Sequence, residues 1–256
     1  MAVLRRSRLR DPRARSAQAY EAVLASVVAS TIDAPAFASP RVDVALAPEM
    51  WQLEPRLLYN LSKRALDIVL SLAALIALLP LFLLTAALIR LDSRGSVFYR
   101  QERMGKDARP FQMLKFRSMH NRDVDIPADL LQRNESTGPL FKIKNDPRVT
   151  RVGRFIRKTS IDELPQFINV LKGEMSLVGP RPPMPRELAG YEVAQLLRLR
   201  VTPGVTGPWQ VGGRSKLTFD DMVRLDLQYI EDRSLLLDLK LLVLTVPTVL
   251  LGHGAY

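Results

Sequence analysis

The stretch that most restricts how this chain can fold runs from Ile68 to Ile89, where 22 consecutive residues carry no charge. A helix of about 20 apolar residues is long enough to cross the hydrocarbon core of a bilayer. Pro80 lies near the middle of the stretch, and a proline inside a helix removes a backbone hydrogen bond and clashes with the preceding turn. The sequence therefore predicts two helical arms that meet at a break.

The residues that flank this stretch are basic at both ends: Lys63 and Arg64 precede it, and Arg90, Arg94, Arg100 and Arg103 follow it. Basic flanks favour the cytoplasmic side of a membrane, and a straight span cannot place both ends there. A re-entrant hairpin can, with arms Ile68–Leu79 and Leu81–Ile89 that reach about 18 and 14 Å, roughly one leaflet. A spanning helix and a buried helix of a soluble protein are the alternatives. Ser71 or Thr85 is expected to satisfy the backbone group freed at Pro80.

The composition narrows the kinds of chemistry that are available. The 256 residues include 37 basic and 26 acidic side chains, a net charge of 37 − 26 = +11, and 47% of them are hydrophobic, which is enough for a packed core. The chain has no cysteine and two histidines, which excludes thiolate nucleophiles and Cys-based zinc sites and argues against a Ser-His-Asp triad. The positive charge indicates an acidic partner, and a nucleic acid is the weaker alternative because only 7% of the residues are aromatic.

The sequence divides into three regions. Residues 1–59 are rich first in arginine and then in alanine and proline, and we expect a largely disordered arm that lies on anionic lipid. Residues 60–96 contain the predicted membrane hairpin, and residues 97–256 are expected to form a cytoplasmic catalytic domain. The expected fold class is α+β and mostly helical, with the re-entrant helix packed on a small domain that has a few short strands.

Local patterns in the third region predict its elements. Alternating side chains in 97–101 and 111–119 predict two strands joined by a turn near Gly105, followed by a loop over 126–150. Helices are expected over 151–160, from about Leu164 to Leu171, and over 186–199, 218–233 and 235–250, with a turn-rich loop over 201–215. The last helix is apolar nearly all round, so it belongs either to the core or to a membrane interface.

The segment RKTSIDELPQF places Asp162 and Glu163 side by side in a basic region. Ser160 and Glu163 fit a helix capping box, which would give the carboxylates a structural role. Pro165 favours a different arrangement, because proline suits the first turn of a helix and moves the helix start to about Leu164. The dyad then lies on the entry turn, where free backbone N–H groups favour phosphate.

The charge around this dyad favours phosphate chemistry. From Phe98 to Ser160 there are 15 basic and 7 acidic residues, a local excess of +8. We expect such a field to lower the carboxylate pKa values and to attract polyanions. Ionised carboxylates can hold Mg²⁺ together with phosphate oxygens, and a carboxylate can also attack phosphorus.

Other candidates for substrate binding are basic or rigid. Pro180 and Pro182 restrict the backbone on either side of Arg181, which forms either a surface turn or a guanidinium aimed at phosphate. Lys115 and Arg157 are candidate phosphate ligands, although each could be a solvated charge. The segment from Gly212 to Ser215, with Arg214, is a weak candidate for a ligand cradle. Asp226 and Asp238 are expected to pair with nearby basic residues.

Taken in order, several segments resemble the bacterial sugar transferases, a family of monotopic phosphoglycosyl transferases: KRALDIVLS, VFYRQERMG, FQMLKFRSM, RKTSIDELPQFINVLKGEMSLVGPRP, VTPGVTGPWQVGGRS and LDLQYIEDRSLLLDLK. The resemblance covers roughly residues 60–256. It implies transfer of a sugar 1-phosphate from a UDP-sugar to undecaprenyl phosphate, with release of UMP. This would be the first membrane step of exopolysaccharide, capsule or glycoconjugate synthesis.

The resemblance also implies roles for single residues. Asp162 matches the family's nucleophile, which forms a covalent phosphosugar intermediate, and Glu163 matches the residue that assists it with Mg²⁺. Arg157 and Arg181 match positions that handle phosphate and nucleotide, Lys115 matches the lysine of the KFR segment, and Pro80 matches the helix-breaking proline. The implied location is the inner membrane, with lipid contacts and the catalytic domain in the cytoplasm, and a homodimer is compatible with it.

The sequence departs from the family at three points. Leu79 stands where serine is common before the breaking proline, GGRS replaces the more usual SGR[ST], and an arginine-rich arm stands where larger members have spanning helices. The long C-terminal part resembles members that handle glucose or galactose. A non-catalytic membrane scaffold of glycan assembly and a membrane-tethered nucleic-acid binder are the alternative functions.

Overall fold

A computed structural model of the chain describes residues 56–120, 132–135, 137–141, 143, 145–214 and 217–250. The predicted disordered arm lies almost wholly outside the described residues, as does the first part of the predicted loop over 126–150. In the part of the chain that is described, helices predominate and the strands are short. The prediction of a mostly helical α+β fold is confirmed.

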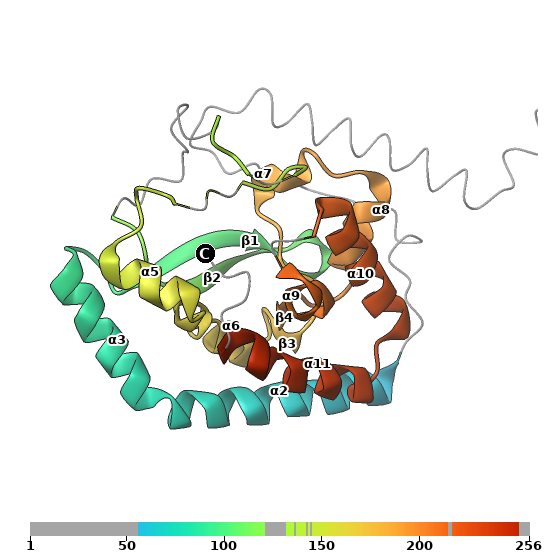
Figure 1. Ribbon diagram of the computed structural model, residues 1–256. Coiled ribbons are helices and arrows are strands. Elements are labelled where there is room, and N and C mark those ends of the chain that lie inside the picture. The colour runs from blue at the N-terminus through green and yellow to red at the C-terminus, as the bar shows by residue number, and fades with distance from the viewer. Residues whose placement is uncertain are drawn as a thin grey trace, which may run out of the picture.

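Two long helices line one side of the molecule, and two small sheets lie against them (Figure 1). The helices are α2 (Leu57–Ala77), α3 (Leu79–Asp92), α5 (Arg151–Lys158), α6 (Gln166–Lys172), α7 (Pro185–Leu188), α8 (Val193–Leu196), α9 (Pro208–Gly212), α10 (Phe219–Asp232) and α11 (Leu235–Leu250). The strands are β1 (Phe98–Met104), β2 (Pro110–Phe116), β3 (Ser176–Val178) and β4 (Gly204–Thr206). Short 3-10 turns span Lys106–Ala108, Ile161–Glu163 and Leu197–Arg200.

The predicted break in the apolar stretch falls at Leu78, where α2 ends and α3 begins at an angle of 61°. Pro80 lies in the first turn of α3, which tolerates a residue without an N–H. Ser71 does not rescue the break, because its buried hydroxyl has no hydrogen-bond partner among the described residues. No single described helix is long and apolar enough to cross a membrane, and the bent pair of α2 and α3 meets that requirement by length and composition only.

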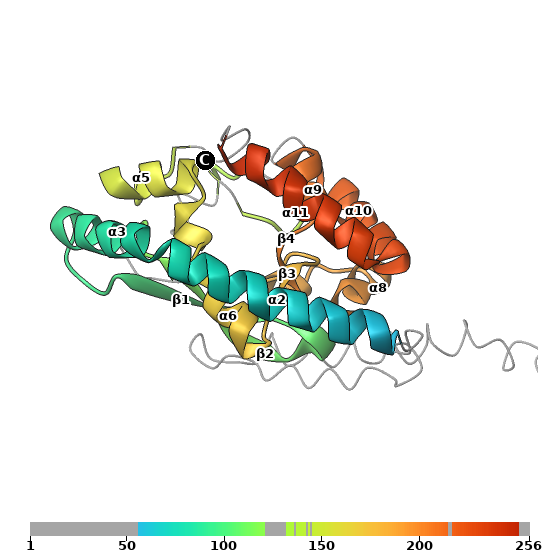
Figure 2. The ribbon, with the colours of Figure 1, turned by 90° about the horizontal axis from the view of Figure 1, so that it is seen from below.

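The inward face of α2 is fastened to the rest of the fold by polar contacts. Asp67 accepts a hydrogen bond from the Leu177 N–H at 2.9 Å, and Arg64 donates to the carbonyls of Val170 and Leu171 at the end of α6. Lys63 forms an ion pair of 2.9 Å with Asp238 of α11. These contacts fix α2 against α6, β3 and α11, which lie beside it (Figure 2).

The outward faces of α2, α3 and α11 are apolar and exposed. Exposed large side chains on α2 and α3 include Leu58, Val69, Ile76, Leu83 and Leu91, and those on α11 are Leu236, Leu239, Val243, Leu244 and Val246. Leu236 is 79% and Val243 70% exposed, whereas Leu241 is buried in a core cluster, so α11 packs one face on the core and exposes the other. The core alternative is confirmed for the inner face of this helix, and the interface alternative for its outer face stays a prediction.

The two sheets differ in how well sequence predicted them. β1 and β2 form the predicted antiparallel hairpin, with Phe98 opposite Phe116 and Gly105 at the turn. β3 and β4 form a parallel pair in which Ser176 is opposite Gly204. The expected loop over 201–215 therefore contains a strand and the short helix α9, a correction to the prediction. A three-residue strand is too short to show alternation, and its pairing depends on a distant segment.

The helices of the second half are mostly those expected, with one exception. α5, α10 and α11 are confirmed, and α6 ends at Gly173, whose φ of 83° suits glycine. The single helix predicted over 186–199 is wrong, because α7 and α8 are separated by Ala189–Glu192 and a 3-10 turn follows. The buried Tyr191 fills this interruption and packs against Phe219 of α10. Tertiary packing thus overrides the local helical pattern.

Candidate active site

A cavity of about 690 Å³ brings together side chains that are far apart in the sequence. Six of the predicted site residues line it: Lys115, Arg157, Asp162, Glu163, Arg181 and Arg214. Pro180 and Pro182 are buried beside it and are not among its lining residues. Their carbonyls accept hydrogen bonds from the Gly204 N–H and from Arg103, so they shape the loop that carries Arg181.

The carboxylate dyad lies on a 3-10 turn, Ile161–Glu163, between α5 and α6. Ser160 has a left-handed backbone with φ of 56°, and its side chain makes no capping hydrogen bond. The capping box is therefore absent, and the dyad occupies the entry turn as Pro165 predicted. Helix α6 itself begins at Gln166, two residues later than expected.

Glu163 is held by Lys115, whose Nζ lies 2.6 Å from its Oε1. Burial opposes ionisation of Glu163, but the charge and hydrogen bond of Lys115, with the charges of Arg103 and Arg214, outweigh it and lower its pKa. The side chain keeps 40% of its surface exposed. Glu163 is thus an ionised carboxylate at the cavity wall.

Asp162 is 8% exposed, and its pKa is raised to about 6. Burial is the largest cause, and the neighbouring charge of Glu163 adds to it, whereas Lys115 and Arg157 act in the opposite direction. The expectation that the basic field lowers both carboxylate pKa values is therefore right for Glu163 and wrong for Asp162. The pKa values of the two neighbours are thus shifted in opposite directions, as those of two groups with different roles often are.

Arg157 reaches the cavity from the last turn of α5. Its Nε donates to the Ser118 hydroxyl at 2.9 Å, just beyond the end of β2. The backbone of α5 approaches Ser118 closely at Gly153, where an added Cβ would lie 2.1 Å from the Ser118 carbonyl oxygen. This close packing sets the position of Arg157 relative to the dyad.

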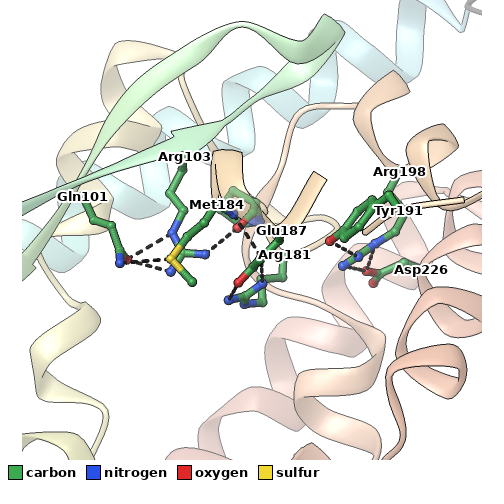
Figure 3. Close-up of polar contacts among 9 residues, drawn as sticks. Gln101, Arg103, Arg181, Met184, Glu187, Tyr191, Arg198 and Asp226 are labelled. Atoms are coloured by element: carbon green, nitrogen blue, oxygen red, sulfur yellow. Dashed lines mark hydrogen bonds and ion pairs between the residues drawn. The ribbon is translucent and has the colours of Figure 1, made fainter. Parts of the chain in front are cut away.

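Arg181 is oriented by Glu187, a residue that the sequence did not single out. The Nη1 and Nη2 groups of Arg181 donate to the two carboxylate oxygens of Glu187 at 2.9 and 3.1 Å (Figure 3). Glu187 is 0% exposed and also accepts the Met184 N–H at 2.9 Å, as a helix cap does. Its sequence signal is therefore that of an ordinary cap at the start of α7.

Two further arginines lie behind this loop. Arg103 is buried, donates to the Pro182 carbonyl at 2.9 Å and is also held by Gln101 (Figure 3). Arg198 forms a buried ion pair of 2.7 Å with Asp226, which confirms the pairing predicted for Asp226. Neither of these arginines lines the cavity, so we assign them a structural role.

The short helix α9 supplies two polar groups that the predicted loop did not suggest. Trp209 and Gln210 line the cavity, and the Trp209 Nε1 donor and the Gln210 Oε1 acceptor are buried without a partner among the described residues. Buried polar groups are rarely left unpaired in the absence of a ligand or water. These two groups can therefore pair with a polar ligand.

Comparison with known proteins gives this cavity a context. The family model described as bacterial sugar transferase matches residues 58–252. The chain belongs to this family. The match includes every site residue discussed above, α2 from its second residue onward and the whole of α3.

Three relatives of this sugar transferase illustrate its similarity. It is 48% identical to the galactosyl transferase CpsE of Streptococcus agalactiae over 198 residues. This aligned stretch covers 76% of this chain and 43% of the relative. It is 41% identical over 201 residues, or 77% of this chain and 89% of the relative, to the exopolysaccharide production protein ExoY of Sinorhizobium fredii. The undecaprenyl-phosphate galactose phosphotransferase of Salmonella typhimurium is 42% identical over 198 residues, 76% of this chain and 41% of that protein.

The carboxylates of the sugar transferase site are too few to enclose a magnesium ion but suit one that is also bound by substrate phosphates. No group of three or more Asp, Glu or His side chains among the described residues could hold a metal. Mg²⁺, however, is commonly bound by one or two carboxylates together with substrate phosphates. Asp162 and Glu163 supply two adjacent carboxylates at the wall of a cavity that is also lined by basic side chains.

Proposed function

We propose that this chain is a polyprenyl-phosphate hexose-1-phosphate transferase. It takes a sugar 1-phosphate from a UDP-sugar, transfers it to undecaprenyl phosphate and releases UMP. The observation that carries the proposal is Asp162, a buried carboxylate that shares one cavity with Lys115, Arg157 and Arg181. The names of the relatives, among them an undecaprenyl-phosphate galactose phosphotransferase and an undecaprenyl-phosphate glucose phosphotransferase, support the same reaction.

The proposed reaction has two displacements at one phosphorus. In the first, a carboxylate oxygen of Asp162 forms a bond to the phosphorus that bears the sugar, and the bond from this phosphorus to the oxygen of UMP breaks. In the second, a phosphate oxygen of undecaprenyl phosphate attacks the same phosphorus, and the Asp162 carboxylate leaves with its electron pair. Asp162 must be ionised for the first step, and its raised pKa makes it the stronger nucleophile of the two carboxylates once ionised.

The other cavity residues stabilise charge and hold the substrate. Lys115 holds Glu163, and Arg157 and Arg181 face the charge that develops on the phosphate oxygens. Arg214, Trp209 and Gln210 lie on or next to α9, where they are placed to bind the rest of the donor. When bound, Mg²⁺ at Asp162 and Glu163 would neutralise donor phosphate charge.

The proposed acceptor requires a site at the membrane surface. In our proposal, α2 and α3 form a re-entrant hairpin in the cytoplasmic leaflet of the inner membrane, and the catalytic domain faces the cytoplasm. The exposed apolar faces of α2, α3 and α11 support this arrangement, since a soluble protein rarely leaves so large an apolar surface uncovered. We expect the enzyme to begin the assembly of an exopolysaccharide or a related glycoconjugate.

Release of UMP tests the proposed reaction. The full chain in neutral detergent would receive Mg²⁺, undecaprenyl phosphate and a panel of UDP-hexoses, with UDP-glucose and UDP-galactose first. We expect turnover with at least one donor, a loss of more than about 10³-fold in Asp162→Asn, and near-normal turnover in Asp232→Asn, which removes an exposed carboxylate of α10. No UMP release with any donor would refute the transferase.

A second measurement tests the covalent step. Without acceptor, the enzyme should release about one UMP per active site and retain the labelled sugar phosphate on the protein. Asp162→Asn should retain none. Turnover in Asp162→Asn that matches the unsubstituted protein would leave a transferase but eliminate Asp162 as the nucleophile.

A further inference from the structure

A second cavity, of about 520 Å³, lies beside the amino-terminal half of α2 and shares no lining residue with the first. Its walls come from α2, the turn after β1, the turn between α6 and β3, the segment before β4 and the end of α10. Five basic side chains line it: Lys63, Arg64, Lys106, Arg200 and Arg233. Two carboxylates, Asp67 and Asp107, also line it, so the lining carries a net charge of 5 − 2 = +3.

Two of the five basic residues already have structural partners. Lys63 is paired with Asp238 at 2.9 Å, and Arg64 donates to the Val170 and Leu171 carbonyls at 2.6 and 2.8 Å. Asp67 is likewise committed, because it accepts the Leu177 N–H. These three residues fasten α2 to the fold and leave Lys106, Arg200 and Arg233 to consider.

Of the remaining cations, Arg200 and Arg233 lie close enough to repel each other, and Asp107 is the other carboxylate of the lining. The Nε of Arg200 is buried and has no hydrogen-bond partner among the described residues. Arg233 donates to the Ile230 carbonyl, and the nearby carboxylate of Asp238 already accepts from Lys63, Tyr59 and Tyr229. Burial and the mutual repulsion of the two guanidinium groups lower the pKa of Arg200. Neighbouring like charges in such a partly buried place are stabilised when an anion lies between them.

We propose that this second cavity binds a phosphate group, with Arg200 and Lys106 as its main donors and Arg233 at its inner wall. Guanidinium groups match phosphate oxygens in geometry, and an ammonium group supplies a mobile donor at the exposed rim. The occupant is a phosphate ester or free phosphate, and the site does not depend on the transfer reaction at Asp162.

Two sources could supply this phosphate, and the position of the cavity bears on them. Asp67 lines the cavity and directly precedes Ile68, the first residue of the uncharged stretch. In the proposed membrane arrangement this level is that of the lipid headgroups, where an anionic phospholipid presents a phosphate diester. Free phosphate in the cytoplasm is the second source. The two share their chemistry and are separated by the probe used.

The test compares two double variants of the full chain in neutral detergent. Lys106→Gln with Arg200→Gln removes two cavity cations, and Arg109→Gln with Arg224→Gln removes two exposed arginines that line neither cavity. Isothermal titration with dihexanoyl phosphatidylglycerol probes the lipid source, and titration with inorganic phosphate probes the free anion. The residues that line the first cavity are unaltered in both variants, so a difference in probe binding between the two variants reports on the second cavity.

We expect binding of at least one probe to weaken about 10- to 100-fold in the cavity variant and to remain within about twofold in the control. Weakening of the lipid probe alone would assign a headgroup, and weakening with inorganic phosphate would assign the free anion. Equal binding of both probes by the two double variants would overturn the proposal. If the double variant does not fold, Lys106→Gln alone keeps the test available, because Lys106 is exposed.

Discussion

At the scale of single residues, the ionisation of Asp162 links activity and stability to pH. Its pKa in the folded protein is about 6, against 3.8 for an unperturbed aspartate. Above pH 6 the folded state holds a buried charge that the unfolded chain solvates, and below pH 3.8 the group is neutral in both states. Asp162→Asn should therefore stabilise the protein by about 1–3 kcal/mol at pH 8, and this gain should disappear near pH 4.

Thermal unfolding in neutral detergent from pH 4 to pH 8 would measure this difference, with Asp232→Asn as the exposed control. The value of kcat/KM for UMP release should rise with pH through about 6, because the ionised carboxylate attacks. A gain in stability that is the same at every pH would contradict the assignment. The position of Pro165 in the sequence was enough to single out Asp162. The raised pKa of Asp162 could not be predicted, because the burial that causes it comes from tertiary packing.

Glu187 makes a second prediction at this scale, as a positioning residue that acts through Arg181. Glu187→Gln should keep the shape of the contact but lose its charge, and kcat/KM should fall about 10- to 100-fold. If Glu187 acts only through Arg181, then Arg181→Gln combined with Glu187→Gln should lose no more activity than Arg181→Gln alone. Additive losses in this double-mutant cycle would assign Glu187 a separate role.

At the scale of elements, Gly153 decides how α5 packs on the end of β2. Alanine normally favours a helix over glycine by about 1 kcal/mol, but here the added Cβ would lie 2.1 Å from the Ser118 carbonyl oxygen. Gly153→Ala should therefore destabilise the protein by about 1–3 kcal/mol and reduce UMP release, because α5 and Arg157 must move. Gly212→Ala is the matched control, since an added Cβ meets nothing within 4 Å. Equal unfolding temperatures for the two variants would contradict this account.

The same scale shows which elements a sequence can predict. The β1–β2 hairpin, α5, α6, α10 and α11 carry their own signals in alternation, capping and glycine stops, and they formed as predicted. β4 and α9 were not predicted. The three residues of β4 lie between a proline and a glycine, are too few to show a period, and pair only with the distant strand β3. The candidate site follows this division: Lys115, Arg157 and the dyad lie on predictable elements, whereas Trp209 and Gln210 lie on α9 and were missed.

At the scale of the whole molecule, the proposed membrane arrangement makes the break at Leu78 decide on which side of the membrane the two flanks of the apolar helices lie. The chain has no cysteine, so single cysteines at Ser62 and Ser96, both exposed, report the two sides of the uncharged stretch Ile68–Ile89 without background. In a re-entrant hairpin, both cysteines react with an impermeant maleimide in inverted membrane vesicles and neither reacts in spheroplasts. In a spanning arrangement, one reacts in each preparation.

The physical reason for the proposed hairpin also predicts a substitution that would convert it into a spanning helix. Pro80→Leu restores the N–H that a continuous helix needs, so α2 and α3 should approach a single helix long enough to cross the bilayer core. The cysteine at Ser96 should then become reactive in spheroplasts in a fraction of the molecules. That fraction stays below one because the basic residues that follow α3 oppose their own transfer across the membrane. UMP release should fall with that fraction, because the catalytic domain follows α3. Labelling of the two flanks from opposite sides in the unsubstituted chain would refute the re-entrant arrangement directly.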